Sequence, residues 1–317
     1  MQNKNFALIG AAGYVAPRHM RAIHDTGNNL IAALDPSDSV GVMDRYSQDV
    51  AFFTEFERFD RHGEKMRRRG EDDRLHYVSI CSPNYLHDAH IRFALRIGAD
   101  AICEKPLVLN PWNLDALADF EQESGGRIFN VLQLRVHPSI VALKDKIENT
   151  QTNSKHSIDL AYITSRGRWY FTSWKGNPSK SGGIASNIGI HFFDMLIWIF
   201  GKCLRQEVHV SEDRRMAGFL ELERANVRWF LSVDREDLPS EALDEGKPTF
   251  RSITVDGHEI EFSEGFGDLH TMVYQDIMSG GGFGLEDARQ SIELVYELRR
   301  SDLVSAPADE VHPLAVR

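Results

Sequence analysis

The sequence predicts a protein of the α/β class, with a doubly wound parallel sheet in its first domain and a mostly antiparallel, open-faced sheet in a second, α+β domain. Two observations support this prediction. Short apolar runs alternate with amphipathic helical segments through the first part of the chain, as in parallel sheets whose strands are joined by helices. From about residue 127 the strand candidates alternate in character and a hairpin signal appears, which favours antiparallel pairing.

The first domain begins with a β-α-β unit. Residues 6–9 form an apolar run that stops at Gly10, a helical pattern continues to Thr26, and residues 30–34 form a second buried run that ends at Asp35. This order is typical of a Rossmann-type sheet. Further strands are expected at residues 77–81, 101–103 and 127–132, with helices at residues 86–97 and 110–124.

The second domain is expected to begin at residue 127, so that the two domains span residues 1–126 and 127–317. Its strands are expected at residues 158–164, 205–210, 217–222 and 227–233, and a hairpin is expected over residues 252–262. The Asp256-Gly257 pair supplies the turn of that hairpin. Helices over residues 268–278 and 286–299 follow, and one face of the sheet would pack on helices while the other stays free to cover a cleft.

Composition excludes several classes of protein. The net charge of -11 opposes a general affinity for nucleic acid or for an anionic membrane. Three cysteines without paired spacing (Cys81, Cys103 and Cys203) indicate neither a disulfide framework nor a zinc site, and no metal is expected. No secretion signal is evident, and the most apolar helix candidate, residues 192–200, is about half as long as a membrane span. We therefore expect a cytoplasmic protein.

The turn after the first strand predicts a dinucleotide site. It reads G-x-x-G-x-x-A, with Gly10 and Gly13 where backbone must approach a pyrophosphate, and with Ala12 and Ala16 where glycine is more usual. Such a turn also suits a plain strand–helix connection, but strand, turn, helix and strand stand in the required order. Asp35 ends the second strand, where a carboxylate can accept hydrogen bonds from ribose hydroxyls and repel a 2′-phosphate. NAD is therefore predicted rather than NADP.

The segment Glu104-Lys105-Pro106 follows another predicted strand. Ligands of doubly wound sheets bind at the carboxyl ends of the strands, so Lys105 would lie where it can reach both the nicotinamide ribose and a substrate hydroxyl. The alternative is a solvated Lys-Pro turn of no special function.

Together, the runs Cys-Ser-Pro-Asn-Tyr-Leu-His87 and Cys-Glu-Lys-Pro-Leu107, after an N-terminal glycine turn, resemble the glucose–fructose oxidoreductase / inositol dehydrogenase family. This resemblance implies a catalytic lysine at Lys105, a cofactor cleft lined by the Pro-Asn turn, and a C-terminal domain with an open-faced sheet. The residues expected to contact the cofactor are Gly10, Ala12, Gly13, Tyr14, Val15, Asp35, Ser82, Pro83, Asn84, His87, Glu104 and Lys105.

The stretch between Asp159 and Asp194 contains no acidic residue, although the chain holds 47 of them. Its cations and aromatic side chains can pair with carboxylate or phosphate and offer flat faces to a sugar or base. These are Arg166, Arg168, Lys175 and Lys180, interleaved with Trp169, Tyr170, Phe171 and Trp174. A basic surface loop is the plainer alternative, and a nucleic-acid platform is opposed by the net charge.

His191 is the second catalytic candidate. It opens an apolar helix directly after a glycine-rich loop, where the helix dipole favours the neutral imidazole, although a lone histidine there is often a core residue. The segment resembles the family's signature Gly-Gly…Asp-x-Gly-x-His-x-x-Asp, in which the histidine is the general base. Asn187 stands where the family usually has aspartate and cannot stabilise an imidazolium as a carboxylate would. Asp194 is a possible orienting residue.

Several longer runs resemble one branch of the family, the bacterial UDP-N-acetylglucosaminuronate 3-dehydrogenases of surface-polysaccharide (O-antigen) synthesis. They include Gln-Leu-Arg-Val-His-Pro138 and Arg-Gly-Arg-Trp-Tyr170, and Asn187 is usual in that branch. The resemblance implies NAD-dependent oxidation of the sugar 3-hydroxyl, with Lys105 and His191 handling the proton. Some relatives re-oxidise the bound cofactor with 2-oxoglutarate, and the family implies a homo-oligomer, a tetramer. The residues expected to bind substrate are Arg166, Arg168, Tyr170, Lys175, Lys180, Asn187 and His191.

Two rival interpretations remain open at this point. Another sugar or cyclitol dehydrogenase of the same family would share the cofactor residues and differ over residues 166–180. A non-catalytic, NAD-sensing regulator on the same fold is the other rival, and the presence of both Lys105 and His191 disfavours it.

Overall fold

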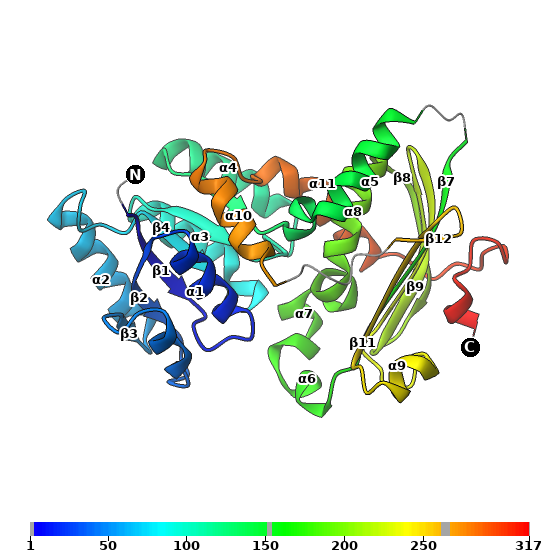
Figure 1. The fold of residues 1–317 in the computed structure, drawn as a ribbon, viewed down its shortest axis with the longest axis horizontal. Coiled ribbons are helices and arrows are strands. Elements are labelled where there is room, and N and C mark those ends of the chain that lie inside the picture. Colours follow the sequence, from blue (N-terminus) through cyan, green and yellow to red (C-terminus); the bar gives the residue numbers. More distant parts are fainter. Residues whose placement is uncertain (1–2, 151–153, 261–266, 317) are drawn as a thin grey trace. The chain divides into compact units, whose positions relative to one another are not determined.

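The computed structural model describes residues 3–150, 154–260 and 267–316. The chain forms two compact units, each built on its own six-stranded sheet (Figure 1). Unit 1 comprises Met1–Gln133 and Gly267–Arg289, and unit 2 comprises Leu134–Phe266 and Gln290–Arg317.

The sheet of unit 1 is parallel throughout, as predicted, with the order β3-β2-β1-β4-β5-β6. Its strands are β1 (Asn5–Ile9), β2 (Asn29–Leu34), β3 (Ala51–Phe53), β4 (Tyr77–Ile80), β5 (Asp100–Cys103) and β6 (Ile128–Asn130). The strand order reverses direction between β1 and β4. In doubly wound sheets ligands bind outside the carboxyl ends of the strands at such a point.

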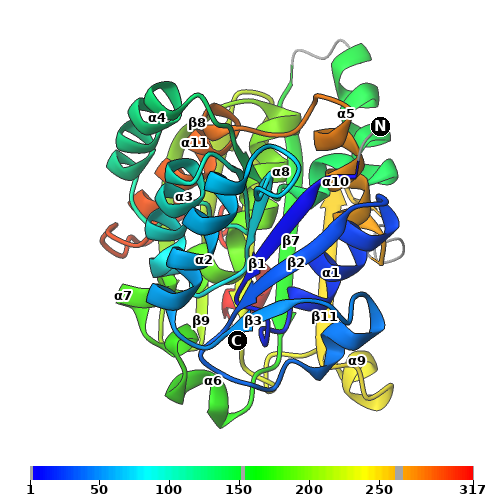
Figure 2. The ribbon, with the colours of Figure 1, turned by 90° about the vertical axis from the view of Figure 1, so that its left-hand side faces the viewer.

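Helices lie on the two sides of this sheet (Figure 2). They are α1 (Ala16–Asp25), α2 (Phe56–Arg69), α3 (His87–Arg96), α4 (Trp112–Ser124) and α10 (Leu269–Met278). Helices α1 and α10 pack on each other, whereas α3 contacts α4 and, through Phe93 and Phe59, also α2. Apolar side chains from both groups and from the strands, Phe6, Leu8 and Met20 among them, are fully buried and form the core of unit 1.

The units differ from the predicted ranges 1–126 and 127–317 in two segments. Residues 127–133 belong to unit 1 because β6 extends the parallel sheet, with Ala101 of β5 opposite Ile128. Residues 267–289 return to unit 1 because α10 packs on α1 and because Asn130 N donates to Phe283 O at 2.7 Å.

The sheet of unit 2 has the order β12-β11-β7-β10-β9-β8 and is antiparallel except for the pair β7–β10. Its strands are β7 (His156–Thr164), β8 (Cys203–Ser211), β9 (Arg215–Leu222), β10 (Ala225–Ser232), β11 (Thr249–Val255) and β12 (His258–Glu259). The predicted hairpin turns at Asp256 and Gly257, whose φ angles of 52° and 79° suit a two-residue turn. Residues 261 and 262 of that prediction lie outside the described residues.

Helices α5 (Pro138–Asn149) and α8 (Ile190–Phe200) lie together on one side of this sheet, where Phe193 meets Trp229 edge to face (Figure 1). The remaining helical elements of unit 2 include α6 (Arg168–Thr172), α7 (Pro178–Ser181), α9 (Ser240–Asp244) and the 3-10 turn η6 (Pro313–Val316). A smaller cluster around Phe230 is partly covered by residues of α9 and η6. Helix α11 (Leu285–Leu298) runs from unit 1 into unit 2.

The apolar helix region is longer than the sequence predicted. The stretch Pro178–Phe200 is long and apolar enough, by length and composition, to cross a membrane. However, 72% of its most apolar window is buried inside the structure, which is the behaviour of a core helix in a globular unit.

Candidate active site

The glycine turn of unit 1 brings backbone close to backbone at the switch point of the sheet. Gly10 directly follows β1 and has a φ of +91°. A Cβ atom built there would lie 2.6 Å from the carbonyl oxygen of Cys81, the residue after β4. Gly13 N donates to Gly10 O at 3.0 Å, and α1 begins at Ala16. The turn therefore has no side chain at its tightest point, as a pyrophosphate-binding turn requires.

Asp35 lies where the sequence predicted it, at the end of β2. Its Oδ2 accepts a hydrogen bond from Ala12 N at 3.0 Å, and its Oδ1 accepts one from Ser37 N at 2.8 Å. The carboxylate is thus held against the glycine turn, as a ribose-binding acid requires. Tyr14, in the same turn, is 85% exposed, and Val15 is the N-cap of α1.

The loop after β4 contains the predicted Pro-Asn turn, and Ser82 and Asn84 in it are buried. The fully buried ring of His87 lies between two carbonyl oxygens, with Nδ1 2.8 Å from Pro106 O and Nε2 2.9 Å from Ser82 O. Burial lowers the pKa of His87 below its usual range, against the opposing influence of these two carbonyl groups. His87 therefore ties the loop after β4 to the Glu-Lys-Pro loop.

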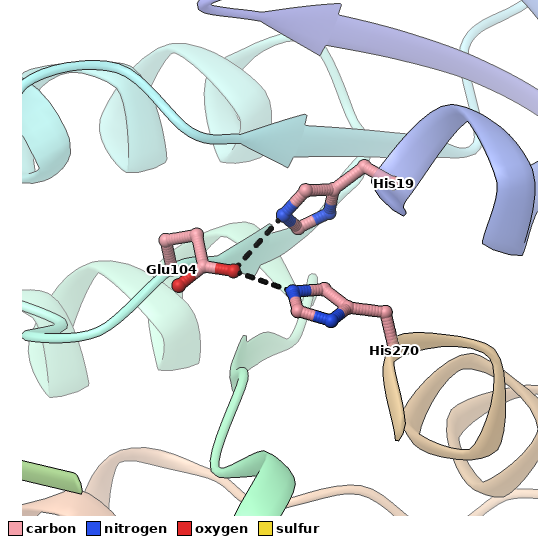
Figure 3. A group of neighbouring side chains, drawn as sticks. All are labelled: His19, Glu104 and His270. Carbon is pink, nitrogen blue, oxygen red and sulfur yellow. Dashed lines mark hydrogen bonds and ion pairs between the residues drawn. The ribbon is translucent and has the colours of Figure 1, made fainter. Parts of the chain in front are cut away.

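Glu104 leaves the end of β5, where its N–H donates to Ile80 O at 2.9 Å, and Lys105 follows it half-buried. The Glu104 carboxylate is buried among unit 1 side chains (Figure 3). Its Oε1 lies 3.1 Å from His19 Nε2 of α1 and 2.8 Å from His270 Nε2 of α10. Burial by itself would raise the pKa of Glu104, but the hydrogen bonds from both histidines hold it well below its usual range.

This network continues beyond the histidines. His19 Nδ1 lies 2.7 Å from the hydroxyl of Tyr274, and that hydroxyl lies 2.6 Å from Ser79 Oγ. The sequence contained a signal for His19 only, which falls on the apolar face of the first predicted helix. His270 and Tyr274 carry no such signal, because nothing in the sequence indicates that α10 returns to the first sheet.

In unit 2, His191 is the second residue of α8, and α8 continues directly from a π-helical turn over Ala185–Gly189. The sequence predicted that His191 opens a helix, but it lies inside a longer helical stretch because the glycine-rich segment before it is itself helical. π-Helical turns are rare and are frequent at functional sites. The amide of Asn187 in this turn donates to the hydroxyl of Tyr170 at 2.8 Å. Burial raises the pKa of Tyr170. Through this hydrogen bond the structure brings together Asn187 and Tyr170, two of the predicted substrate residues.

The four predicted cations occupy a run of short helical turns between β7 and α8. Arg168 and Lys180 are exposed, whereas Arg166 and Lys175 are half-buried. The ammonium of Lys175 lies 4.4 Å from the ring centroid of Trp174. The run is tightly folded, because a Cβ atom at Gly176 would lie 2.5 Å from the backbone of Phe171.

Asp194 accepts two hydrogen bonds from Arg135, a partner that the sequence did not indicate. Arg135 Nε lies 2.9 Å from Oδ2, and Nη2 lies 2.8 Å from Oδ1, with both side chains buried. A role of Asp194 in orienting His191 stays a prediction.

Comparison with known proteins gives two domain matches in chain order. The model of an oxidoreductase family with an NAD-binding Rossmann fold matches residues 4–131, and that of the family's C-terminal alpha/beta domain matches residues 144–239. Among curated relatives, the glucose-6-phosphate 3-dehydrogenase of Bacillus subtilis is 25% identical over 203 residues, which are 62% of this chain and 54% of that protein. The putative oxidoreductase YteT of the same organism is 27% identical over 39% of this chain and 30% of its own length. The matches thus span about half or less of these curated relatives.

Two solved structures are similar over nearly the whole chain. The WlbA (WbpB) dehydrogenase of Thermus thermophilus in complex with NAD and alpha-ketoglutarate is 49% identical, with a TM-score of 0.94, and the match covers 98% of this chain and 99% of that one. The same enzyme in complex with NAD and UDP-GlcNAcA is 48% identical, with a TM-score of 0.93 and the same coverage. Both domain models and this full-length likeness agree with the glycine turn and the Asp35 position, and the chain belongs to the glucose–fructose oxidoreductase / inositol dehydrogenase family of NAD-dependent oxidoreductases.

Proposed function

We propose that the protein oxidises the 3-hydroxyl of UDP-N-acetylglucosaminuronic acid to a ketone, with NAD as the hydride acceptor. The observation that carries this proposal is the 48% identity, over 98% of the chain, to a dehydrogenase solved in complex with NAD and UDP-GlcNAcA. The chain also has Lys105 and His191 at the two positions that the family motifs assign to catalysis.

The chemistry requires one proton acceptor and one hydride acceptor. When bound, NAD takes the hydride from C3 of the sugar. His191, assisted by Lys105, takes the proton of the 3-hydroxyl, so that the O–H and C–H bonds break while the carbonyl forms. His191 lies in α8 directly beyond the π-helical turn that carries Asn187, and its imidazole is the side chain to which we assign the proton. The ammonium of Lys105 can stabilise the developing negative charge on the oxygen.

We propose that the nucleotide sugar binds to the segment of unit 2 between Asp159 and Asp194, which contains no acidic residue and is called the acid-free segment below. The substrate would carry a diphosphate and a uronate, and in an acidic chain these anions need local cations. We assign this role to Arg166, Arg168, Lys175 and Lys180. Tyr170 and Asn187, joined by their 2.8 Å hydrogen bond, would contact sugar hydroxyl groups.

We further propose that 2-oxoglutarate re-oxidises the bound NADH, since the first Thermus thermophilus complex contains NAD together with alpha-ketoglutarate. The hydride would reduce the 2-oxo group to a hydroxyl group, and the proton that His191 took from the sugar would pass to the new hydroxyl oxygen. A cytoplasmic homotetramer that serves surface-polysaccharide synthesis completes the proposal. Light scattering after gel filtration tests the tetramer.

The decisive experiment follows NADH absorbance near 340 nm after NAD and UDP-N-acetylglucosaminuronate are mixed with the protein. Absorbance should rise, and 2-oxoglutarate should then remove it. Lys105→Met and His191→Asn should abolish the signal, whereas the exposed controls Lys247→Met and His24→Asn should preserve it. Oxidation of inositol or a neutral sugar, with the nucleotide uronate inert, would contradict the proposed substrate. Normal signals in both catalytic variants would contradict the mechanism.

A further inference from the structure

Three histidines lie buried around the Glu104-Lys105-Pro106 segment, each from a different helix of unit 1. They are His19 of α1, His87 of α3 and His270 of α10. We propose that these histidines are positioning residues for Lys105: two hold the carboxylate that precedes it, and one holds the carbonyl group that follows it. This inference rests on the proposed function, in which Lys105 takes part in proton transfer.

On the N-terminal side of Lys105, the Glu104 carboxylate receives its hydrogen bonds from donors that are all part of unit 1. His19 and His270 both point Nε2 at the same oxygen, Oε1, at 3.1 and 2.8 Å (Figure 3). The other oxygen, Oε2, accepts from the backbone N–H of Lys105 at 3.3 Å. An ionised carboxylate accepts only, so each Nε2 must carry a proton.

The protonation of His19 follows from this arrangement. Burial lowers the pKa of His19, so the neutral ring holds a single N–H, and that N–H donates from Nε2 to Glu104. Its Nδ1 must then accept, and the donor 2.7 Å away is the hydroxyl of Tyr274. Because that proton is used, Ser79 must donate to the Tyr274 oxygen at 2.6 Å. One direction of donation thus runs from Ser79 to Glu104.

His270 differs from His19 in one respect that can be tested. Its Nε2 donates to Glu104, but within the described part of the chain its buried Nδ1 has no hydrogen-bond partner. Nε2 is therefore the ring nitrogen through which His270 forms a hydrogen bond in the described part of the chain. A glutamine at this position can supply an N–H near the place of Nε2, whereas a leucine cannot.

On the C-terminal side, the ring of His87 lies with Nδ1 2.8 Å from Pro106 O and Nε2 2.9 Å from Ser82 O. Since burial favours the neutral ring, His87 carries one N–H and donates to one of these two carbonyl groups. The backbone is thus fixed on both sides of Lys105 by rings that have no freedom to move in a packed interior. Fixing the stem in this way reduces the conformations open to the ammonium before substrate binds, which is how supporting residues raise a reaction rate. The buried negative charge of Glu104 also attracts the positive charge of the Lys105 ammonium group.

The same three ligand-type side chains, His19, Glu104 and His270, place one donor atom each within 4.8 Å of one another. A divalent cation held there would displace the two N–H protons and would make the cluster a metal centre. The separations of 2.8 and 3.1 Å and the donation from Tyr274 to His19 are those of a hydrogen-bonded network, and we adopt that interpretation. Metal analysis of the purified protein separates the two.

The test compares His270→Leu with His270→Gln in the complete protein, with His24→Leu and His24→Gln as exposed controls on α1. Single-turnover NADH formation should slow about 10- to 100-fold in His270→Leu and recover most of the loss in His270→Gln. The affinity for NAD should stay within about threefold, because the network holds the lysine segment rather than the cofactor. The pH profile of the rate should move to lower pH in His270→Leu, since the buried Glu104 carboxylate binds a proton more readily when it loses a donor, and it then no longer favours the charged form of Lys105.

Tyr274→Phe serves as a second, conservative variant where His270→Leu does not fold. It removes one hydroxyl group and leaves the ring, and it should slow hydride transfer and shift the pH profile in the same direction. Three results would each overturn the inference. His270→Leu could react as fast as the wild-type protein, or His270→Gln could be as slow as His270→Leu. Alternatively, the wild-type protein could contain one metal ion per chain that both His270 variants lack. If the Lys105→Met variant forms NADH at the normal rate, the catalytic role of Lys105 in the proposed function is contradicted. If Lys105→Met is inactive while His270→Leu and Tyr274→Phe are normal, only the positioning role fails.

Discussion

The guanidinium group of Arg135 and the carboxylate of Asp194 form a two-point ion pair inside unit 2, with N–O separations of 2.9 and 2.8 Å. Arg135 lies in the short helical turn Gln133–Val136, and Asp194 lies in the middle of α8. The pair therefore anchors the helix whose first turn carries His191. A fork-to-fork geometry of this kind fixes orientation as well as distance.

Breaking this pair from one side should be costly. Arg135→Met should lower the free energy of unfolding by about 3–5 kcal/mol, because it removes the guanidinium charge that faces the buried Asp194 carboxylate. The double variant Arg135→Met/Asp194→Leu should recover a large part of that loss. Thermal and urea unfolding measure both effects. A single variant as stable as wild type, or a double variant no better than the single one, would contradict a coupled buried pair.

Gly10 should tolerate no side chain. Gly10→Ala places a Cβ atom 2.6 Å from Cys81 O at a φ of +91°, so either the turn or the loop after β4 must move. We expect loss of measurable NAD binding together with reduced stability. Gly27→Ala is the matched control: it also has a positive φ, of +72°, but nothing lies within 4 Å of its Cβ position. It should cost about 1 kcal/mol and leave NAD affinity unchanged. Titration with NAD by fluorescence, alongside thermal unfolding, distinguishes the two.

Asp35 should decide between NAD and NADP. Asp35→Ser removes the charge that opposes a 2′-phosphate, and it leaves one hydroxyl oxygen where two carboxylate oxygens now accept from Ala12 N and Ser37 N separately. NAD affinity should fall about tenfold, and the preference for NAD over NADP should shrink by at least as much. Dissociation constants for both cofactors give the answer, with the exposed Asp38→Ser as the control. An unchanged ratio would remove Asp35 from cofactor selection.

Acid should destabilise the protein before its carboxylates titrate. Burial, followed by the charge of His87, lowers the pKa of His90 in unit 1 from 6.5 to about 4. Between these two values the unfolded chain binds a proton that the folded chain excludes, so stability is complete above pH 6.5 and is lost as the pH falls toward 4. The loss from His90 amounts to at most about 3 kcal/mol. His90→Asn keeps a polar partner for Ser82 Oγ and should flatten the dependence of unfolding on pH from 7 to 4.5, whereas His24→Asn should not.

Local signals in the sequence were sufficient to predict the first β-α-β unit of unit 1. The first strand, Gly10, the helix after it and Asp35 follow one another within one β-α-β unit, and apolar periodicity reveals each of them. The same method found neither β3 nor α2. Strand β3 has only three residues, which is too short for a periodic signal. Helix α2 does carry such a signal, since Phe59, Gly63 and Met66 recur at helical spacing in an otherwise polar segment, so its omission was a missed pattern.

The side-chain networks could not be predicted in the same way, because their partners are far apart in sequence. His270 meets Glu104 across 166 residues, and Arg135 meets Asp194 across 59. Polar partners of this kind are chosen by tertiary packing, and a motif that marks one residue, such as Glu104 or Asp194, does not indicate its partner. Glu104 was expected to contact the cofactor for the same reason: its place at the strand end was visible in the sequence, but the direction of its side chain was not.

Asn187 should affect substrate binding through its hydrogen bond to Tyr170, at a position where the family usually has aspartate. Its amide nitrogen donates to the Tyr170 hydroxyl, which leaves the hydroxyl proton of Tyr170 available to an anionic or hydroxylated ligand. In Asn187→Asp the carboxylate would accept that proton and add a negative charge beside the acid-free segment. We therefore expect KM for the nucleotide uronate to rise about tenfold or more, with a smaller effect on kcat. Tyr170→Phe should raise KM in the same way. Adding Asn187→Asp to Tyr170→Phe should then raise KM by less than it does in the wild-type protein, because the hydrogen bond between the two residues is already lost. Steady-state kinetics across the three variants measures this coupling, and fully additive effects would show that Asn187 and Tyr170 do not act through their shared hydrogen bond.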